Sequence, residues 1–293
     1  MASLTNSIVI GGSGFLGSRL TKLLEPLGGI GTFNSRPFLG GTKFDITSDY
    51  ISSISERPRC VFVVGGAIEM DGCARDPERT ALINVQGSIR TLKQAIELGS
   101  KPIFISTDYV FDGESGDRTE QDKAVPRMEY GRQKLAVENW LKTQNCDWLI
   151  IRLSKVVSGD RNTHSTLGQW VNAILAGEMQ KAAIDQVFSP AHVDDVAGAI
   201  IRLAKLGETG LFHLGGPKAY SRYSLFQLLI DKIIEVQPSL SFTLEPCRLH
   251  DFPFLEQRPL NTSLSIEKLQ KKINWPFRSM DEVCTILARE YFS

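Results

Sequence analysis

The feature that most constrains the fold is a short apolar run that leads into a glycine-rich turn near the start of the chain. The stretch reads IVIGGSGFLG, and the residues after it place Phe15, Leu16, Leu20 and Leu24 on one helical face. A strand, a tight turn and a helix in this order present the free N–H groups of the helix start to an anion. Glycine also lets the backbone approach a pyrophosphate, so the stretch predicts a dinucleotide-binding unit.

The glycine spacing fits two versions of this motif. It reads G-x-x-G-x-x-G at Gly11, Gly14 and Gly17, and equally G-x-G-x-x-G from Gly12. Both versions imply the same chemistry, because each provides the turn, the close approach and the packing of helix on strand. The cofactor-binding residues predicted for this unit are Gly11, Gly14, Phe15, Leu16 and Gly17.

The rest of the chain alternates strands and helices. Buried strands are predicted in IGTFNS, RCVFVVGGA, KPIFIST, DWLIIRLS and GLFHLGG, with helices over 77–98, 130–143 and 192–207. This alternation predicts an α/β fold, a Rossmann-like doubly wound parallel sheet. We expect 1–155 to form the NADP-binding domain, with 188–215 returning to it. The smaller substrate-binding lobe is expected from 156–187 and 216–293, where irregular stretches are more common.

The end of the second strand bears on which dinucleotide binds. An NAD-preferring site usually has an acidic residue here, but this chain has Asn34, Ser35 and Arg36, and no acid before Asp45. Arg36 could pair with a 2′-phosphate that a carboxylate would repel. We therefore predict NADPH as the cofactor and keep NADH as the second choice. The alternative is that Arg36 is a solvated loop cation.

A second motif suggests acid–base chemistry. Tyr130 and Lys134 have Y-x-x-x-K spacing, which places them one turn apart on the same helical face. We expect the ammonium to lower the pKa of the phenol, because it stabilises the phenolate. Thr107 and Asp108 end a predicted buried strand, where an open α/β sheet presents residues to its ligand. A hydroxyl at Thr107 could hold a substrate oxygen while Tyr130 transfers a proton.

With these motifs, the stretches INVQGS, ISTDYVFDG, DQVFSPAHVDDVA and RPLNTSLS make the chain resemble the extended short-chain dehydrogenase/reductases, most closely the dTDP-4-dehydrorhamnose reductases. The resemblance runs along nearly the whole chain. It implies that the catalytic trio is Thr107, Tyr130 and Lys134. It implies that Asp45 and Ile46 line the adenine, and that Gly65, Gly66 and Ala67 contact the middle of the cofactor. Asn84, also a predicted cofactor contact, then corresponds to the asparagine that supports the catalytic lysine. The residues then expected to face the substrate are Asp108, Lys155, Gln186 and Arg258, the last toward its nucleotide part.

Two departures from the family pattern concern the substrate. The chain has Ala67 and Ile68 where the family usually has an aromatic residue and a threonine. It has Lys155 where the rhamnose-pathway reductases tend to have a tryptophan. Both changes fall near the expected sugar ring, so they leave the cofactor chemistry in place and the particular sugar open.

Composition excludes several other classes. The chain has 33 basic and 33 acidic residues without a basic stripe, which argues against nucleic acid and membrane partners. Its first residues lack the pattern of a signal peptide, and no apolar run has the length of a membrane helix. The five cysteines form no C-x-x-C pair, and the four histidines, His164 among them, show no metal-ligand spacing. We expect a cytoplasmic protein without a metal.

Three functions remain open from the sequence. The first is NADPH-dependent reduction of a keto group on a nucleotide-linked deoxysugar, with Tyr130 as general acid beside Lys134 and Thr107. The second is a non-catalytic NADP-binding subunit similar to the regulatory β subunit of methionine adenosyltransferase, since an intact trio can persist in a binding protein. The third is a nucleotide-sugar epimerase or dehydratase. It ranks last because Asp108 stands where dehydratases usually have a glutamate. A homodimer is left open.

Overall fold

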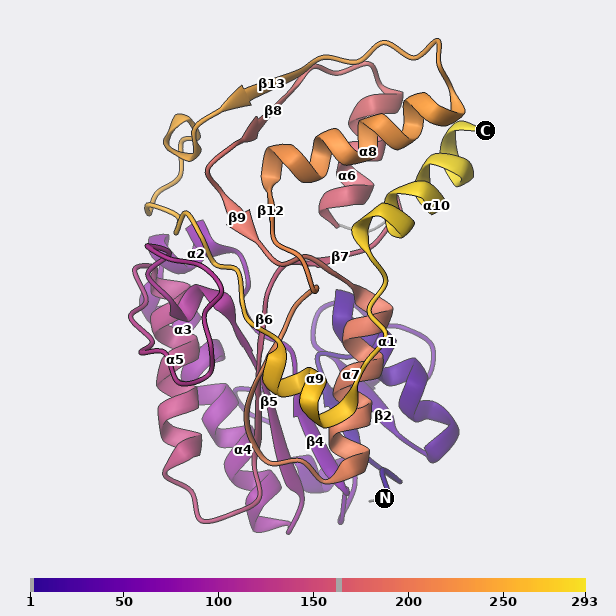
Figure 1. Ribbon diagram of the computed structural model, residues 1–293. Coiled ribbons are helices and arrows are strands. Elements are labelled where there is room, and N and C mark those ends of the chain that lie inside the picture. Colours follow the sequence, from indigo (N-terminus) through magenta and orange to yellow (C-terminus); the bar gives the residue numbers. More distant parts are fainter. Residues whose placement is uncertain (1–2, 162–164) are drawn as a thin grey trace.

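A seven-stranded parallel sheet forms the centre of the computed structural model, which describes residues 3–161 and 165–293 (Figure 1). Its strand order is β11-β6-β5-β4-β1-β2-β3, so the order reverses between β4 and β1. This is the strand order of a dinucleotide-binding doubly wound sheet, and the predicted fold class is confirmed. The strands are β1 (Ile8–Ile10), β2 (Ile30–Phe33), β3 (Thr42–Lys43), β4 (Cys60–Val63), β5 (Lys101–Thr107), β6 (Leu149–Leu153) and β11 (Gly210–Leu214).

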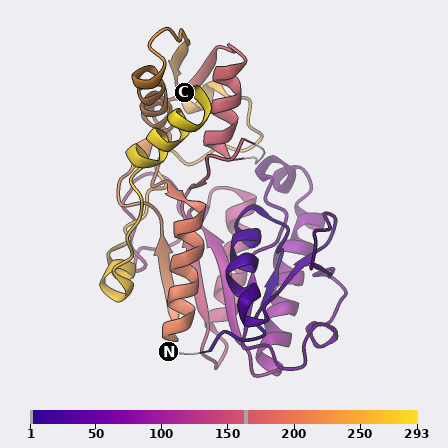
Figure 2. The same cartoon turned by 90° about the vertical axis from the view of Figure 1, so that its right-hand side faces the viewer.

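Helices cover both faces of the sheet. On one face α1 (Phe15–Leu24) lies against α7 (Val193–Leu206), as Figure 2 shows from the side. On the other face lie α4 (Ser88–Glu97) and α5 (Glu129–Lys142). Strands such as β4 are buried on both faces by these layers, which explains why they are apolar throughout.

The helix predicted over 77–98 is interrupted. The structure has α3 (Pro77–Ala81), then a π-helical segment η3 (Leu82–Gly87), and then α4. The side chain of Asn84, inside η3, is bonded to the backbone of Ala67 in the loop after β4. A π-helical turn inside an α-helix often marks a functional site. This one brings Asn84 to the loop at the carboxyl end of β4.

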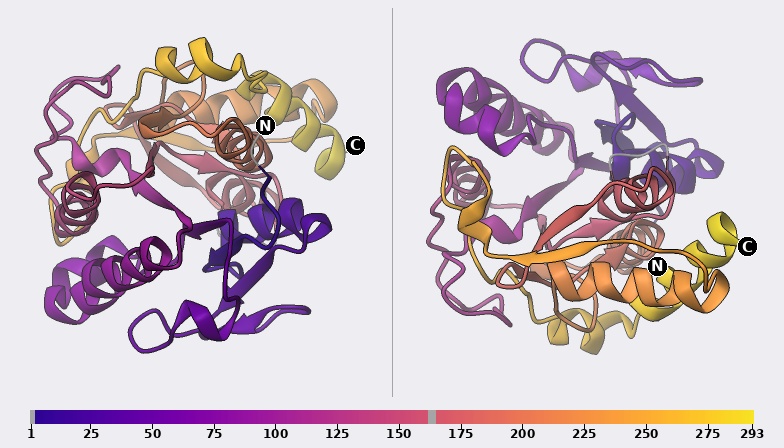
Figure 3. Two further views of the ribbon diagram at one scale, coloured as in Figure 1. Left: turned by 90° about the horizontal axis from the view of Figure 1, so that it is seen from below. Right: turned by 90° about the horizontal axis from the view of Figure 1, so that it is seen from above.

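A second group of elements lies above the carboxyl ends of the strands (Figure 1). Its core is formed by three helices that pack around Trp170 and Phe226, whose rings stack with centroids 4.2 Å apart. Seen from above, the lobe covers part of the sheet, and the early part of the chain lies beside it (Figure 3). The lobe contains α6 (Thr166–Leu175), α8 (Arg222–Val236), α10 (Met280–Phe292) and the paired strands β8 (Gln180–Ala183) and β13 (Leu244–Cys247).

The connections between the two groups are short paired strands. They are β7 (Val156–Val157) with β10 (Ala191–His192), and β9 (Val187–Phe188) with β12 (Tyr220–Ser221). The range 216–293, predicted to be lobe throughout, is divided in space. Its helix α9 (Glu267–Ile273) packs Leu269 into the core between the sheet and α7, because its apolar face meets β11 there.

Over the described ranges 3–161 and 165–293, each helix is too short or too polar to span a membrane.

Candidate active site

A cavity of about 800 Å³ lies where the carboxyl ends of the strands meet the lobe. It extends from the ends of β1 and β2 past β4 to the ends of β5 and β6, and so across the point where the strand order reverses. Ligands of open α/β sheets bind at this point. Of the predicted site residues, those on the cavity wall are Gly11, Gly14, Phe15, Leu16, Gly17, Asn34, Ser35, Arg36, Gly65, Gly66, Thr107, Asp108, Tyr130, Lys134, Lys155 and Gln186.

The glycine turn forms one end of this cavity. Gly11 has a φ of +88°, and a Cβ atom on Gly17 would lie 2.0 Å from the carbonyl oxygen of Gly11. The structure therefore requires glycine at Gly11 and Gly17, whereas a Cβ atom on Gly14 would lie 3.1 Å from the same carbonyl oxygen, a less severe contact. The first helical hydrogen bond runs from the N–H of Ser18 to the carbonyl of Gly14, so the N–H groups of Phe15, Leu16 and Gly17 precede it. Within the described chain no side chain caps α1. Its N-terminal N–H groups therefore remain available to an anion such as a pyrophosphate.

The residues after β2 line the same end of the cavity. Asn34, Ser35 and Arg36 are exposed, and the Asn34 side chain accepts a hydrogen bond of 2.7 Å from Lys43 Nζ. Their place beside the glycine turn is where the adenosine part of a dinucleotide would lie. Arg36 therefore stands where it can meet a 2′-phosphate.

Two predicted adenine contacts are not on the cavity wall. Asp45 accepts hydrogen bonds from the N–H and hydroxyl of Thr47, which lower the pKa of Asp45. Ile46 is buried, and it contacts Gly87 in the core beside the sheet. Their contact with adenine stays a prediction.

Asn84 and Ala67 are also outside the wall, but they shape it. The Asn84 amide accepts from the N–H of Ala67 at 2.7 Å and donates to its carbonyl at 2.9 Å. It also donates to Gln133 Oε1 on α5 at 2.8 Å. No hydrogen bond joins Asn84 to Lys134 in the part of the chain that the structure describes. Asn84 instead fixes the loop after β4 to the helix that carries the predicted acid.

The three residues predicted to be catalytic come together at the end of β5 and the start of α5. Thr107 is the last residue of β5, while Tyr130 and Lys134 lie one turn apart on α5, and all three are nearly buried. Lys134 Nζ donates to the carbonyl of Ile105 at 2.9 Å. The Thr107 hydroxyl donates to Asp108 Oδ1 at 3.1 Å.

The predicted direction of the Tyr130 pKa is wrong for the residues that the structure describes. Burial raises the pKa of Tyr130, and the charge of Asp108 raises it further. Lys134 does not offset this, because its ammonium is bonded to the Ile105 carbonyl and lies 5.9 Å from the Tyr130 ring centroid. Burial also lowers the pKa of Lys134 to about 8.

Beyond the trio, the cavity wall carries charged residues that face the lobe. Asp108 is buried, and its pKa is raised to about 6 by burial, against hydrogen bonds from Thr262 and Thr107 that lower it. Lys155 follows β6, and its pKa is lowered to about 8 by burial and then by the charge of Arg222. Gln186 also lines this end.

Sequence reasoning missed three residues of this end: Tyr109, Arg222 and Thr262. Tyr109 lies edge-on to Tyr130 with ring centroids 6.5 Å apart, and its place in the ISTDYVFDG stretch was a usable signal. Arg222 begins α8, and Thr262 follows the RPLN stretch, far along the chain from the catalytic motif. Only the fold brings them to the cavity.

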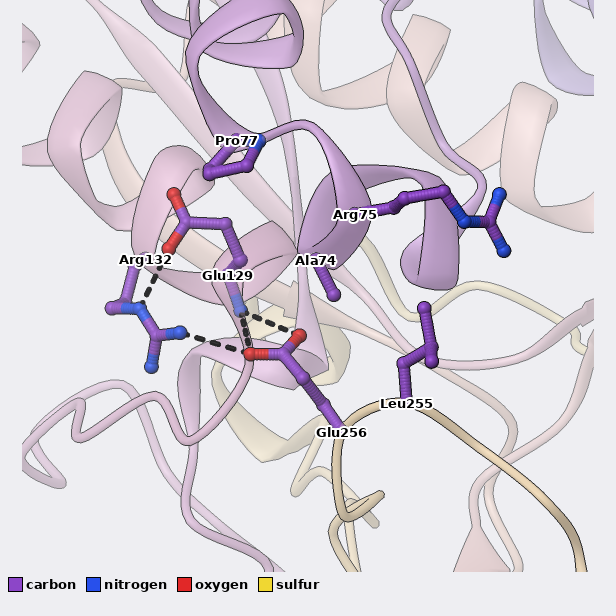
Figure 4. A pocket seen from close by; sticks show the side chains of 7 residues that line it. All are labelled: Ala74, Arg75, Pro77, Glu129, Arg132, Leu255 and Glu256. Carbon is purple, nitrogen blue, oxygen red and sulfur yellow. Dashed lines mark hydrogen bonds and ion pairs between the residues drawn. The ribbon is translucent and has the colours of Figure 1, made fainter.

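Arg258 is placed differently from the expected substrate contact. Its guanidinium bonds to Asp71 Oδ1 on α2 (Met70–Arg75) at 2.6 Å, and it is 7% exposed. It does not line the cavity, so its contact with the nucleotide stays a prediction. The same segment is fixed again by Glu256, whose carboxylate accepts from the N–H of Glu129 and from Arg132 (Figure 4).

Glu256 and Arg132 belong to a second, smaller pocket of about 560 Å³ (Figure 4). Their charges are mutually paired, and Arg75 points away from them. This arrangement ties Glu256 and the segment around it to the start of α5.

No group of three or more metal-ligating side chains occurs in the ranges 3–161 and 165–293. His164 lies outside the described residues. His213 is fully buried, and its backbone N–H donates to the carboxylate of Glu120. Burial lowers the pKa of the His213 imidazole to about 4. The carboxylate of Glu120 is thus engaged in the scaffold.

Comparison with known proteins agrees with this architecture. A probable low-salt glycan biosynthesis reductase, Agl14 of Haloferax volcanii, is 29% identical over 281 residues, 91% of this chain and 92% of that protein. The dTDP-4-dehydrorhamnose reductase of Escherichia coli K12 is 29% identical over 279 residues, 91% of each chain. A solved structure of a hypothetical dTDP-4-dehydrorhamnose reductase from Sulfolobus tokodaii has a TM-score of 0.82 and 28% identity, covering 94% of this chain and 98% of that one.

The predicted resemblance is confirmed by a family model as well. The model described as the RmlD substrate binding domain matches residues 5–291, nearly the whole chain. The chain therefore belongs to the RmlD substrate-binding domain family.

Proposed function

We propose that this protein is an NADPH-dependent reductase of a keto group on a nucleotide-linked deoxysugar. One observation carries the proposal: a single cavity joins the glycine turn at one end to Thr107, Tyr130 and Lys134 at the other. A dinucleotide bound along the strand ends would therefore reach the trio with its far end. The reductase names of the relatives, at 29% identity over 91% of this chain, support the same reaction class.

The residues at the turn fit the cofactor. The free N–H groups at the start of α1 would hold the pyrophosphate, and Arg36 would hold a 2′-phosphate. Lys134 Nζ uses one of its three donors on the Ile105 carbonyl, which leaves two for the cofactor's ribose. When bound, NADPH supplies the hydride, and the chain positions and polarises the carbonyl.

Tyr130 is the proton donor. A phenol is protonated at neutral pH, as a proton donor must be. The raised pKa of Tyr130 makes it a weaker acid, so the proton would move only as negative charge develops on the substrate oxygen. Thr107 would donate to the same oxygen, because a developing alkoxide competes with Asp108 for the hydroxyl proton.

The test is consumption of NADPH with a dTDP-4-keto-6-deoxyhexose, followed by near-ultraviolet absorbance for wild type and Tyr130→Phe. We expect the variant to bind NADPH normally and to lose about 10²- to 10⁴-fold in turnover, the range for removal of a general acid. Intact turnover in Tyr130→Phe would remove Tyr130 from the mechanism. Tight NADPH binding with no turnover by wild type, and a partner enzyme that co-purifies in equal amount, would favour a regulatory subunit instead.

A further inference from the structure

Two cations face the cavity from opposite sides. Lys155 lies two residues beyond the end of β6, where Leu153 pairs with Thr107 across the sheet. Arg222 is the first residue of α8 in the lobe. One cation therefore belongs to the sheet and the other to the lobe, and both are close enough for the charge of Arg222 to lower the pKa of Lys155.

Among the described residues neither cation forms an ion pair, although the charge of Asp108 acts on Lys155. In the ranges 3–161 and 165–293, no hydrogen bond or ion pair involves Lys155 Nζ or the Arg222 guanidinium. Arg222 rests over the ring of Trp170, 5.4 Å from its centroid. A partly buried charge without a counter-charge is costly, and two like charges together add to the cost.

The carboxylates nearby do not remove this excess of positive charge. Asp108 receives hydrogen bonds from Thr107 and Thr262, and its charge acts on Lys155, but the described residues show no ion pair between the two. Asp160, also on the wall, has a partner of its own. In the described part of the chain, the lobe end of the cavity thus has two cations without an ion pair, beside Asp108, which is already hydrogen-bonded, and Asp160, which has an interaction of its own.

We infer that Lys155 and Arg222 together bind an oxyanion of the substrate, one that lies between the sheet and the lobe. The inference rests on the proposed function, because it assigns the charge of the molecule that the cavity would reduce. An ammonium and a guanidinium supply charge-assisted donors for such a group. A nucleotide-linked sugar offers two sources of it, the diphosphate and a carboxylate on the sugar ring. The place of Lys155 beside Thr107 puts the oxyanion near the reacting carbon.

The experiment measures binding by calorimetry with NADPH present, and it uses four ligands that do not react: dTDP, UDP, UDP-glucose and UDP-glucuronate. The variants are Lys155→Met and Arg222→Met, each of which removes one charge and keeps an unbranched chain. Lys155→Arg and Arg222→Lys keep the charge. Lys123→Met and Arg57→Met remove an exposed charge away from the cavity wall as controls. No turnover is required, so failure of this site and failure of the proposed reaction are separate results.

Two outcomes support the inference and identify the oxyanion. If both Met variants weaken all four ligands by about tenfold to 100-fold, the diphosphate is the group bound. If they weaken UDP-glucuronate by that factor and leave UDP-glucose within twofold, the group is a carboxylate on the sugar. In either case the charge-keeping variants and the two controls stay near wild type.

The inference is overturned if the Met variants bind all four ligands within twofold of wild type, or if wild type binds none of them. Thermal unfolding separates binding from folding. Because Lys155→Met removes an unpaired charge, its unfolding temperature should be equal to or above that of wild type. A lowered unfolding temperature together with unchanged affinity would show that Lys155 serves the scaffold alone.

Discussion

Arg152 and Lys155 are three residues apart at the end of β6, but their surroundings are opposite. The Arg152 guanidinium donates to both oxygens of Glu138, at 2.9 and 2.7 Å, and both side chains are almost fully buried. Glu138 also accepts from Ser106 at 2.6 Å. Lys155, on the cavity wall, has no such carboxylate among the described residues.

The difference separates two uses of buried charge. The Arg152–Glu138 pair ties α5 to β5 and β6 one turn beyond Lys134, on the same helical face, and its charges are satisfied by the protein. The charge of Lys155 is left for a group outside the protein. Paired charges in this molecule build the scaffold, and unpaired ones face the ligand.

Breaking the scaffold pair should have the largest effect on stability. Glu138→Gln keeps the shape of the side chain but leaves Arg152 buried without a counter-charge. We expect the free energy of unfolding to fall by about 3–5 kcal/mol, measured by denaturant unfolding. Glu267→Gln is the matched control, because its pair with Lys271 on α9 is exposed and little change in the free energy of unfolding is expected there. If Glu138→Gln and Glu267→Gln lowered the free energy of unfolding equally, the buried pair would have no special role in the scaffold.

Removing the charge of Asp108, the carboxylate in the cavity, should raise the free energy of unfolding instead of lowering it. The raised pKa of Asp108, about 6, lets the native state keep a proton that the unfolded chain has already released. Stability therefore falls as pH rises from about 4 through 6, because the unfolded state binds fewer protons in that window. Asp108→Asn should remove this slope and raise the free energy of unfolding at pH 7 by about 2–3 kcal/mol.

Urea unfolding at a series of pH values between 4 and 7 checks this prediction. Asp122→Asn is an informative control, because hydrogen bonds from Thr119 lower the pKa of Asp122 and give a slope of the other sign. A slope that survives Asp108→Asn would show that other groups cause it.

The smallest effect is expected at the exposed end of the cavity. Arg36→Ala removes the cation that we place against the 2′-phosphate, and we expect about a tenfold loss of NADPH affinity. NADH affinity should not change, because NADH lacks that phosphate. The measurement is fluorescence titration with both cofactors, with the exposed Arg57→Ala as control. If both cofactors lose affinity equally, or neither does, Arg36 is a solvated loop cation.

Local motifs carry the predictions for the cofactor end and the trio. The spacing of Gly11, Gly14 and Gly17 can be read from one short stretch, and Y-x-x-x-K spacing puts Tyr130 and Lys134 on one helical face whatever surrounds the helix. These features need no knowledge of the tertiary structure.

Features that depend on distant contacts could not be predicted in the same way. Arg258 meets Asp71 from 187 residues along the chain, and Arg222 reaches the cavity only because the lobe folds over the sheet. The direction of the Tyr130 pKa is set by burial, which no local motif records. The π-helical break at Leu82–Gly87 accompanies the bond between Asn84 and Ala67, again a contact between separate segments.

The central claim is that the cavity transfers a hydride to a keto carbon, and deuterium transfer tests it most directly. NADPH labelled with deuterium at nicotinamide C4, on the face that is transferred, would be used with a dTDP-4-keto-6-deoxyhexose, and the product analysed by mass spectrometry and NMR. We predict one deuterium per product, on the carbon that gains the hydroxyl, with one NADPH consumed for each. A product without deuterium, or a changed sugar with no net consumption of NADPH, would contradict the reductase assignment.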